Sequence, residues 1–236
     1  MTKKPTAEAL ATTRANYMRW MRTQWDVDDL ARQGENLVFC YAVWGGAFAN
    51  LRGKDWLRAL RANRAECVPE KRQQSWDSVR DLAMNVRVRS GGYNLLPWLM
   101  FPIGHSERWH ALQQVHMVGP KIAAWTLRDL SFWMDYRPVL GRKEITLARK
   151  RDPSWFRALP ALAQAAYLPI DRWVHRGCVE HGVYTEAEVG GSFSVVQSTP
   201  ERHEDAARRL ASWCMERDLD AREVNVHWFW TGSKSE

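Results

Sequence analysis

Between His116 and Trp125, the sequence HMVGPKIAAW places one lysine where a tight turn runs into a helix. Gly119 would supply the backbone freedom of the turn, and Pro120 suits the first helical position, where no N–H is needed. The first turn of a helix presents unpaired N–H groups and the positive end of the helix dipole, which together attract a phosphate. Lys121 is therefore expected at an anion-binding helix start.

The choice of lysine at this position has a chemical consequence. Only eight of the 34 basic residues are lysines, and the others are arginines. An arginine stays protonated in a protein, whereas a partly desolvated lysine can lose its proton and attack a carbon centre. Lys121 is thus a candidate nucleophile. The alternative is a lysine that binds phosphate or is only solvated.

A second candidate lies in the segment LPIDRWVHR, residues 168–176. Pro169 and Ile170 lead into Asp171, and a helical pattern follows, so Asp171 is expected to cap the N-terminus of a helix. Most aspartates in such a position act only as caps, so this segment alone does not indicate a reaction.

The residues before the turn extend the first motif. Between residues 106 and 115, Trp109, Leu112 and Val115 recur at helical spacing, which predicts a helix ahead of the turn. Two helices joined by a short glycine hairpin form a clamp for a DNA backbone.

Together, the two segments resemble the helix-hairpin-helix DNA glycosylases, whose hallmark is a Gly/Pro-rich loop followed by an aspartate. Residues 118–123 (VGPKIA) match the hairpin that places the lysine in that superfamily, and residues 169–172 (PIDR) match the segment that places the carboxylate across the cleft. The tail, residues 224–232 (VNVHWFWTG), is similar to the aromatic-Thr-Gly ending of the short 8-oxoguanine glycosylase/lyases of archaea and some bacteria.

The chain departs from this pattern in three places. Met117 stands where the family usually has the first hairpin glycine. Trp173 replaces a histidine that often follows the aspartate, so a phosphate contact is lost there or moved to Arg172 or His175. The two motifs are also separated by more than one helix and a loop, which indicates an insertion between them.

The resemblance implies a DNA glycosylase/AP lyase that excises an oxidised purine, most simply 8-oxoguanine, from double-stranded DNA. Asp171 would stabilise the positive charge that develops on the deoxyribose and help Lys121 lose its proton. Lys121 would attack C1′, form a Schiff base and permit strand nicking by β-elimination. The alternatives are another damaged or modified base, a monofunctional glycosylase in which Lys121 only binds phosphate, and a non-catalytic DNA-binding module.

The resemblance also suggests residues that meet the DNA. Backbone contacts are expected from Val118, Gly119, Arg172 and His175. Trp125 lies one helical turn after Lys121, so it is either part of the pocket for the extruded base or a core aromatic.

Charge supports a polyanionic partner. The chain of 236 residues has a formal net charge of +7 and a pI near 9.4. Residues 137–157 hold seven basic and two acidic side chains. Arg149, Lys150 and Arg151 in this segment are expected to contact DNA, with a solvated loop as the alternative. The 14 tryptophans offer stacking faces for a flipped base, although most are expected in the core.

Other features limit the class of protein. No signal peptide is apparent, and the longest apolar stretch, residues 95–104, is too short to span a membrane. The four cysteines are scattered without a CxxC pair, so reduced thiols and no iron–sulfur cluster are expected. The sequence predicts no metal and no cofactor, and it favours a cytoplasmic, nucleoid-associated monomer.

The periodicity predicts an all-α fold. Helices are expected at residues 6–24, 35–51, 55–66, 70–89, 106–116, 120–134, 154–166, 171–181 and 201–217, while residues 191–197 could be extended. By the resemblance, residues 35–135 form a helical domain that ends in the hairpin. Residues 1–34 and 136–236 form the second domain, and the active cleft lies between Lys121 and Asp171.

Overall fold

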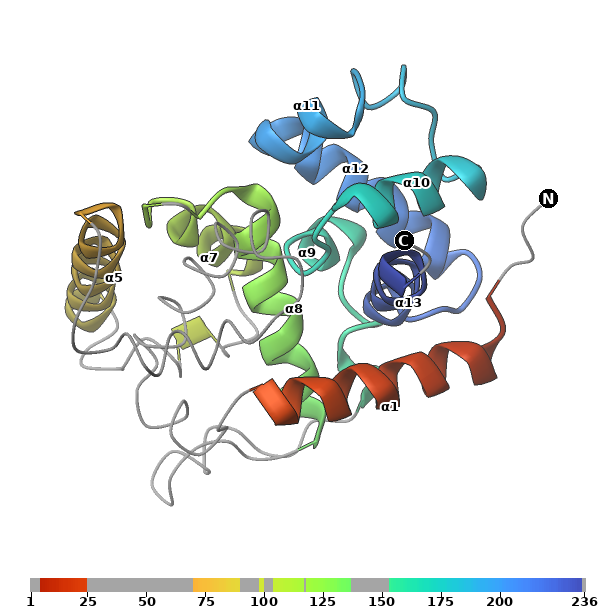
Figure 1. Cartoon of the computed structure of the whole chain (residues 1–236), viewed down its shortest axis with the longest axis horizontal. Helices are drawn as coiled ribbons and strands as arrows, with labels where there is room; N and C mark the ends of the chain where they lie inside the picture. The colour runs from red at the N-terminus through yellow and green to blue at the C-terminus, as the bar shows by residue number, and fades with distance from the viewer. Residues whose placement is uncertain are drawn as a thin grey trace.

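The computed structural model describes residues 5–24, 70–89, 98–99, 104–116, 118–136 and 153–234. Every regular element in these ranges is helical, so the all-α class is confirmed for this part of the chain (Figure 1). The helices are α1 (Ala7–Gln24), α5 (Glu70–Arg89), α7 (His105–Leu112), α8 (Pro120–Tyr136), α9 (Ala161–Ala165), α10 (Arg172–Glu180), α11 (Phe193–Ser198), α12 (Pro200–Met215) and α13 (Ala221–Lys234), with a 3₁₀ turn at Pro153–Trp155.

Most of the predicted helices that lie within these ranges are confirmed to within a few residues. The exceptions have local causes. The predicted helix 154–166 is broken, because Pro160 adopts an extended conformation and starts the short α9. Residues 193–198 are helical, which settles the segment whose conformation the sequence left open. The predicted helices 35–51 and 55–66 lie outside the described residues.

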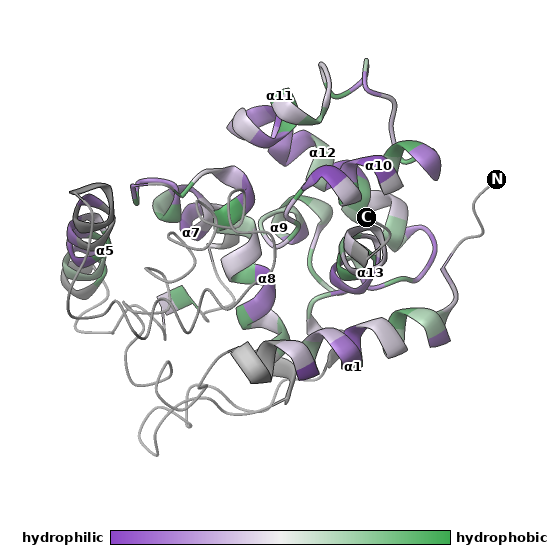
Figure 2. Ribbon diagram, in the orientation of Figure 1, coloured by the Kyte–Doolittle hydropathy of each residue, from purple (hydrophilic) through white to green (hydrophobic). Residues whose placement is uncertain are grey.

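Helix α13 was not predicted from periodicity. Its sequence is rich in β-branched and aromatic residues, which have modest helix propensity. Tertiary packing stabilises it instead, because Val224, Val226 and Phe229 are buried against neighbouring helices. The polar and apolar residues of α1 alternate along its ribbon (Figure 2), and its buried face packs against α13. The N-terminal helix thus contacts the C-terminal helix, and the division of the chain into two domains stays a prediction.

Helix α8 forms the centre of the core. Every residue from Ile122 to Phe132 is buried, which fits a helix contacted on all sides. Helices α7, α11 and α12 contact it. Helix α1 crosses it where Tyr17 meets Trp125 and Asp129 (Figure 1). Lys121 lies at the end of α8 that approaches α12.

Candidate functional site

The connection between α7 and α8 is closed by backbone hydrogen bonds. Trp109, Leu112 and Val115 are buried as predicted. The Val118 N–H donates to the Val115 carbonyl at 2.9 Å, so both the side chain and the N–H of Val118 are engaged within the fold. Helix α8 begins at Pro120 as predicted. The fold therefore uses Val118 as a packing residue and leaves it no N–H for a phosphate.

Gly119 differs from its expected role. Its backbone φ lies outside the left-handed region, and a Cβ added there would meet nothing within 4 Å. The prediction that the turn needs the conformational freedom of glycine is therefore wrong, because an L-residue fits the backbone and the space. The exposed position leaves the start of α8 open to close approach from outside.

Lys121 lies in the first turn of α8 and is partly buried. Among the described residues it makes no hydrogen bond and no ion pair. Burial lowers the pKa of its amine, and attraction to the Asp171 carboxylate opposes this only in part. The neutral amine is thus easier to form here than on a solvated lysine.

Asp171 caps α10, as the sequence predicted. One carboxylate oxygen, Oδ1, accepts hydrogen bonds from the backbone N–H groups of Trp173 and Val174, both at 2.8 Å. Oδ2 has no hydrogen-bond partner within the described part of the chain. Burial raises the pKa of Asp171, while the bond from Val174 and the charge of Lys121 act in the opposite direction. The cap leaves one oxygen for a further interaction.

The fold brings Lys121 and Asp171 together from distant positions in the sequence. Their charges interact, although Nζ and the carboxylate oxygens are more than 4.0 Å apart and form no direct ion pair. Burial lowers the pKa of the amine and raises that of the carboxyl group. Both shifts are towards the neutral forms, so the proton affinities of the amine and the carboxylate are closer to each other here than in water.

Two other predicted site residues are buried and contact other residues of the protein. Trp125 is only 4% exposed, and its indole N–H donates to the Tyr17 hydroxyl at 3.1 Å, which favours the core alternative over the base pocket. His175 is 4% exposed and lies against the Tyr184 hydroxyl, 3.3 Å from Nδ1, and Glu186. Both side chains are thus enclosed by the fold.

The helix that follows Asp171 holds an exposed arginine. Arg172 is exposed, and its guanidinium lies 4.4 Å from the centroid of the Trp173 ring. Trp173 also packs on Gly232, where a Cβ would lie 2.7 Å from its ring. Gly232 in the tail therefore makes room for the Trp173 side chain. Arg149, Lys150 and Arg151 lie outside the described residues, as does Met117.

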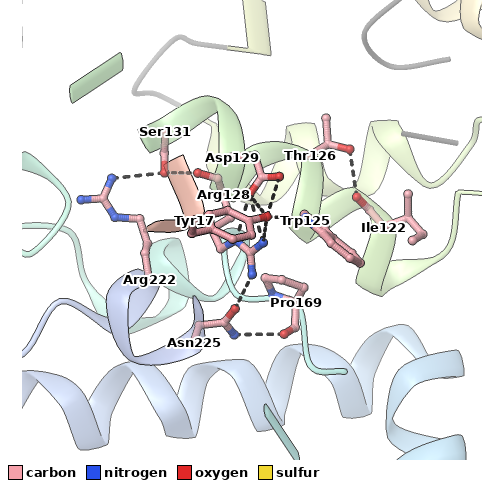
Figure 3. A network of polar contacts seen from close by, with 10 residues as sticks. All are labelled: Tyr17, Ile122, Trp125, Thr126, Arg128, Asp129, Ser131, Pro169, Arg222 and Asn225. Atoms are coloured by element: carbon pink, nitrogen blue, oxygen red, sulfur yellow. Dashed lines mark hydrogen bonds and ion pairs between the residues drawn. The ribbon is translucent and has the colours of Figure 1, made fainter. Parts of the chain in front are cut away.

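A buried polar network fixes the loop before Asp171 (Figure 3). Arg128 on α8 pairs with Asp129 at 3.0 Å and donates to the Tyr17 hydroxyl at 2.7 Å. It also donates to the Asn225 side-chain oxygen at 2.7 Å, and Asn225 donates to the Pro169 carbonyl at 3.0 Å. Asn225 thus links the helix of Lys121 to the segment that carries Asp171.

A second link passes through α12. His203 is fully buried, and its Nε2 accepts a hydrogen bond from the Ile170 N–H at 3.1 Å. The ring stacks on Trp109, with centroids 5.7 Å apart, and Trp109 donates to the Pro120 carbonyl at 3.0 Å. The backbone just before Lys121 and the backbone just before Asp171 are therefore connected.

The sequence interpretation did not identify Arg128, Asn225 or His203. A signal was present for two of them. Arg128 and Asp129 adjoin within an otherwise apolar helix, which is typical of a buried pair. His203 precedes Ala207, Leu210 and Cys214 at helical spacing, which places it on the core face of its helix.

The described residues contain no cluster of three or more histidine, cysteine or acidic side chains arranged to hold a metal ion. Within the same ranges, no helix combines the length and apolar character needed to cross a membrane. No family model, curated protein or solved structure matches the chain.

Proposed function

We propose that the protein is a DNA glycosylase with AP lyase activity, in which Lys121 is the nucleophile and Asp171 assists it. One observation carries this proposal. The amine of Lys121 is partly buried without an ion pair, and its pKa is lowered next to a carboxylate that keeps a free oxygen. A lysine that serves only to bind phosphate has no need of burial, because burial disfavours the charge that binds the anion. The surroundings of Lys121 therefore suit a nucleophile better than a lysine that only binds phosphate.

The proposed reaction uses both groups. Asp171 accepts the proton of Lys121, and the neutral amine attacks C1′ of the deoxyribose while the bond from C1′ to the base breaks. The departing base takes the bonding electrons and gains a proton. Asp171, which returns to its charged form as it gives up that proton, stabilises positive charge on the sugar. The bond from C1′ to O4′ then breaks, O4′ takes a proton from the attached nitrogen, and the nitrogen and C1′ form a protonated Schiff base on Lys121. Loss of a C2′ proton to water breaks the bond from C3′ to oxygen, so the 3′ phosphate leaves and the strand is nicked.

The proposed partner is double-stranded DNA that contains a damaged base. In this proposal, α7, the connection and α8 form a helix-hairpin-helix clamp, and the open backbone at Gly119 admits a phosphate at the start of α8. Arg172 provides a second exposed positive charge next to Asp171. Residues 35–135 would form one domain and the remainder the other, with the cleft between them. The basic segment with Arg149, Lys150 and Arg151 would track the DNA backbone.

An oxidised purine, with 8-oxoguanine as the first candidate, is the proposed substrate. This choice rests on the tail that is similar to 8-oxoguanine glycosylase/lyases. The packing of α13 against α10 is consistent with it, since Gly232 contacts Trp173 two residues after Asp171. The tail is thus part of the surroundings of the proposed site.

A panel of DNA duplexes tests the proposal. Each duplex carries one lesion, which is 8-oxoguanine, another oxidised or alkylated purine, or uracil, and one further duplex is undamaged. We expect single-turnover release of an oxidised purine by the wild-type protein and none by Lys121→Gln. Arg208→Gln, which alters an exposed basic residue on α12, is the matched control and should excise like wild type. A wild-type protein that binds these duplexes and releases no base would contradict the proposed reaction.

A further inference from the structure

We propose that His203 is a positioning residue for the Lys121–Asp171 pair, because it joins the backbone before Asp171 to the start of the lysine helix. The inference deepens the proposed function and rests on it. His203 is fully buried and lies on α12, away from both motifs in the sequence. Its contacts nevertheless reach both of them.

The first contact fixes the Asp171 segment. The Ile170 N–H donates to Nε2 of His203 at 3.1 Å. Ile170 is the residue immediately before Asp171, so this bond sets the direction in which the chain enters α10. Asn225 holds the preceding carbonyl, that of Pro169. Two successive residues of the segment are therefore tied to two different helices.

The second contact reaches the lysine helix. The imidazole of His203 stacks on Trp109 at an interplanar angle of 25°. Trp109 donates its indole N–H to the carbonyl of Pro120, the residue before Lys121. The ring of His203 thus links the Asp171 segment to the start of the lysine helix, alongside the link through Asn225.

The bond from Ile170 also fixes the chemical form of His203. Nε2 accepts, so it carries no hydrogen, and Nδ1 carries the single ring proton. Nδ1 is buried and has no hydrogen-bond partner among the residues that the structure describes. Burial and the charge of Lys121 lower the pKa of His203 to about 3, so the ring stays neutral wherever the enzyme would work. A charged His203 would lose the Ile170 bond and repel protonated Lys121. Lys121 of α8 is close enough for its charge to act on this ring, and Trp109 of α7 stacks on it.

Two variants and a matched control test the inference. His203→Leu keeps an apolar side chain and removes the acceptor, whereas His203→Gln can still accept from Ile170 through its amide oxygen. His181→Gln, the control, alters a partly exposed histidine at the C-terminal end of α10 that stacks on Trp228. We expect His203→Leu to slow single-turnover excision at least about tenfold and to leave DNA affinity unchanged. His203→Gln should recover most of the rate, and His181→Gln should match wild type.

Hydrogen exchange of the Ile170 amide gives a readout that needs no substrate. Its protection should be lost in His203→Leu, restored in His203→Gln and retained in the control. Wild-type excision by a folded His203→Leu, or equal losses in the Leu and Gln variants, would overturn the inference and leave the role of Lys121 standing. Absence of excision in the wild-type protein would refute the proposed function, and the exchange data would still decide whether His203 holds the segment. Should the Leu variant not fold, the Gln variant and the tautomer of His203 in ¹⁵N NMR remain decisive, since a ring protonated on Nε2 also contradicts the inference.

Discussion

Helix α8 carries two basic residues, Lys121 and Arg128, on the same face two turns apart, and the fold treats them in opposite ways. Arg128 is fully buried and satisfied by Asp129, Tyr17 and Asn225. Lys121 is partly buried with no hydrogen bond or ion pair among the described residues. A buried charge with a complete set of partners holds the structure together. A desolvated charge without partners is available for chemistry.

Arg222 on α13 follows the pattern of Arg128. It is fully buried, pairs with Asp220 at 2.6 Å and donates to the Ser131 hydroxyl at 3.1 Å. Three arginines (Arg108, Arg128 and Arg222) and no lysine are therefore buried in the described core. Arginine suits this role because its planar guanidinium binds several partners and stays charged, whereas a lysine in a desolvated position gives up its proton more easily.

Removal of the Arg128 guanidinium should have the largest effect on stability. Arg128→Met leaves Asp129 buried without its ion pair and Asn225 without its donor. We expect the free energy of unfolding to fall by about 3–5 kcal/mol, measured by urea denaturation. Arg157→Met, which breaks an exposed pair with Asp218, should change it by less than about 1 kcal/mol. Similar values for the two variants would show that the network does not stabilise the core.

Asp171→Asn separates catalysis from capping. Asparagine caps a helix about as well as aspartate, so the stability of the variant should stay close to that of wild type. The carboxylate charge is lost, and we expect single-turnover excision to fall on the order of 10²-fold with DNA affinity retained. Asp205→Asn, a substitution in a surface ion-pair cluster on α12, serves as the control. A decrease of less than about threefold would reduce Asp171 to a helix cap.

Lys121→Met tests the lysine of this comparison. It should raise the free energy of unfolding slightly, whereas Arg128→Met should lower it. The folded-state pKa of Lys121 lies below its ordinary value of 10.5, so the unfolded chain binds the proton more tightly. The folded protein is therefore penalised at neutral pH and below, and wild-type stability should rise as the pH increases through the folded pKa towards 10.5. We expect the variant to be more stable than wild type by roughly 1 kcal/mol at neutral pH.

This gain in stability should shrink as the pH approaches 10.5, the ordinary pKa of lysine. Thermal unfolding of both proteins over a series of alkaline buffers measures the difference. A loss of stability in Lys121→Met at neutral pH would mean that the charged amine is well accommodated, which would remove the physical basis for its reactivity.

The sequence predicted the parts of the site that depend on local rules. Pro120 at a helix start and Asp171 as a cap follow from backbone chemistry within a few residues, and the structure confirms both. The links between them depend on packing between distant segments, so they could not be predicted in this way. The Ile170 bond to His203 spans 33 residues, and the Arg128 bond to Asn225 spans 97. Helix α13 was missed for the same reason, since neighbours rather than propensity stabilise it.

The central claim is that Lys121 becomes covalently attached to the sugar. Borohydride reduces a Schiff base to a stable amine, so incubation of the wild-type protein with borohydride and a duplex containing 8-oxoguanine should yield a cross-linked product. Mass spectrometry of its peptides should place the sugar remnant on Lys121, and Lys121→Gln should give no cross-link while it still binds the duplex. A cross-link on another lysine, or full trapping by Lys121→Gln, would contradict the account.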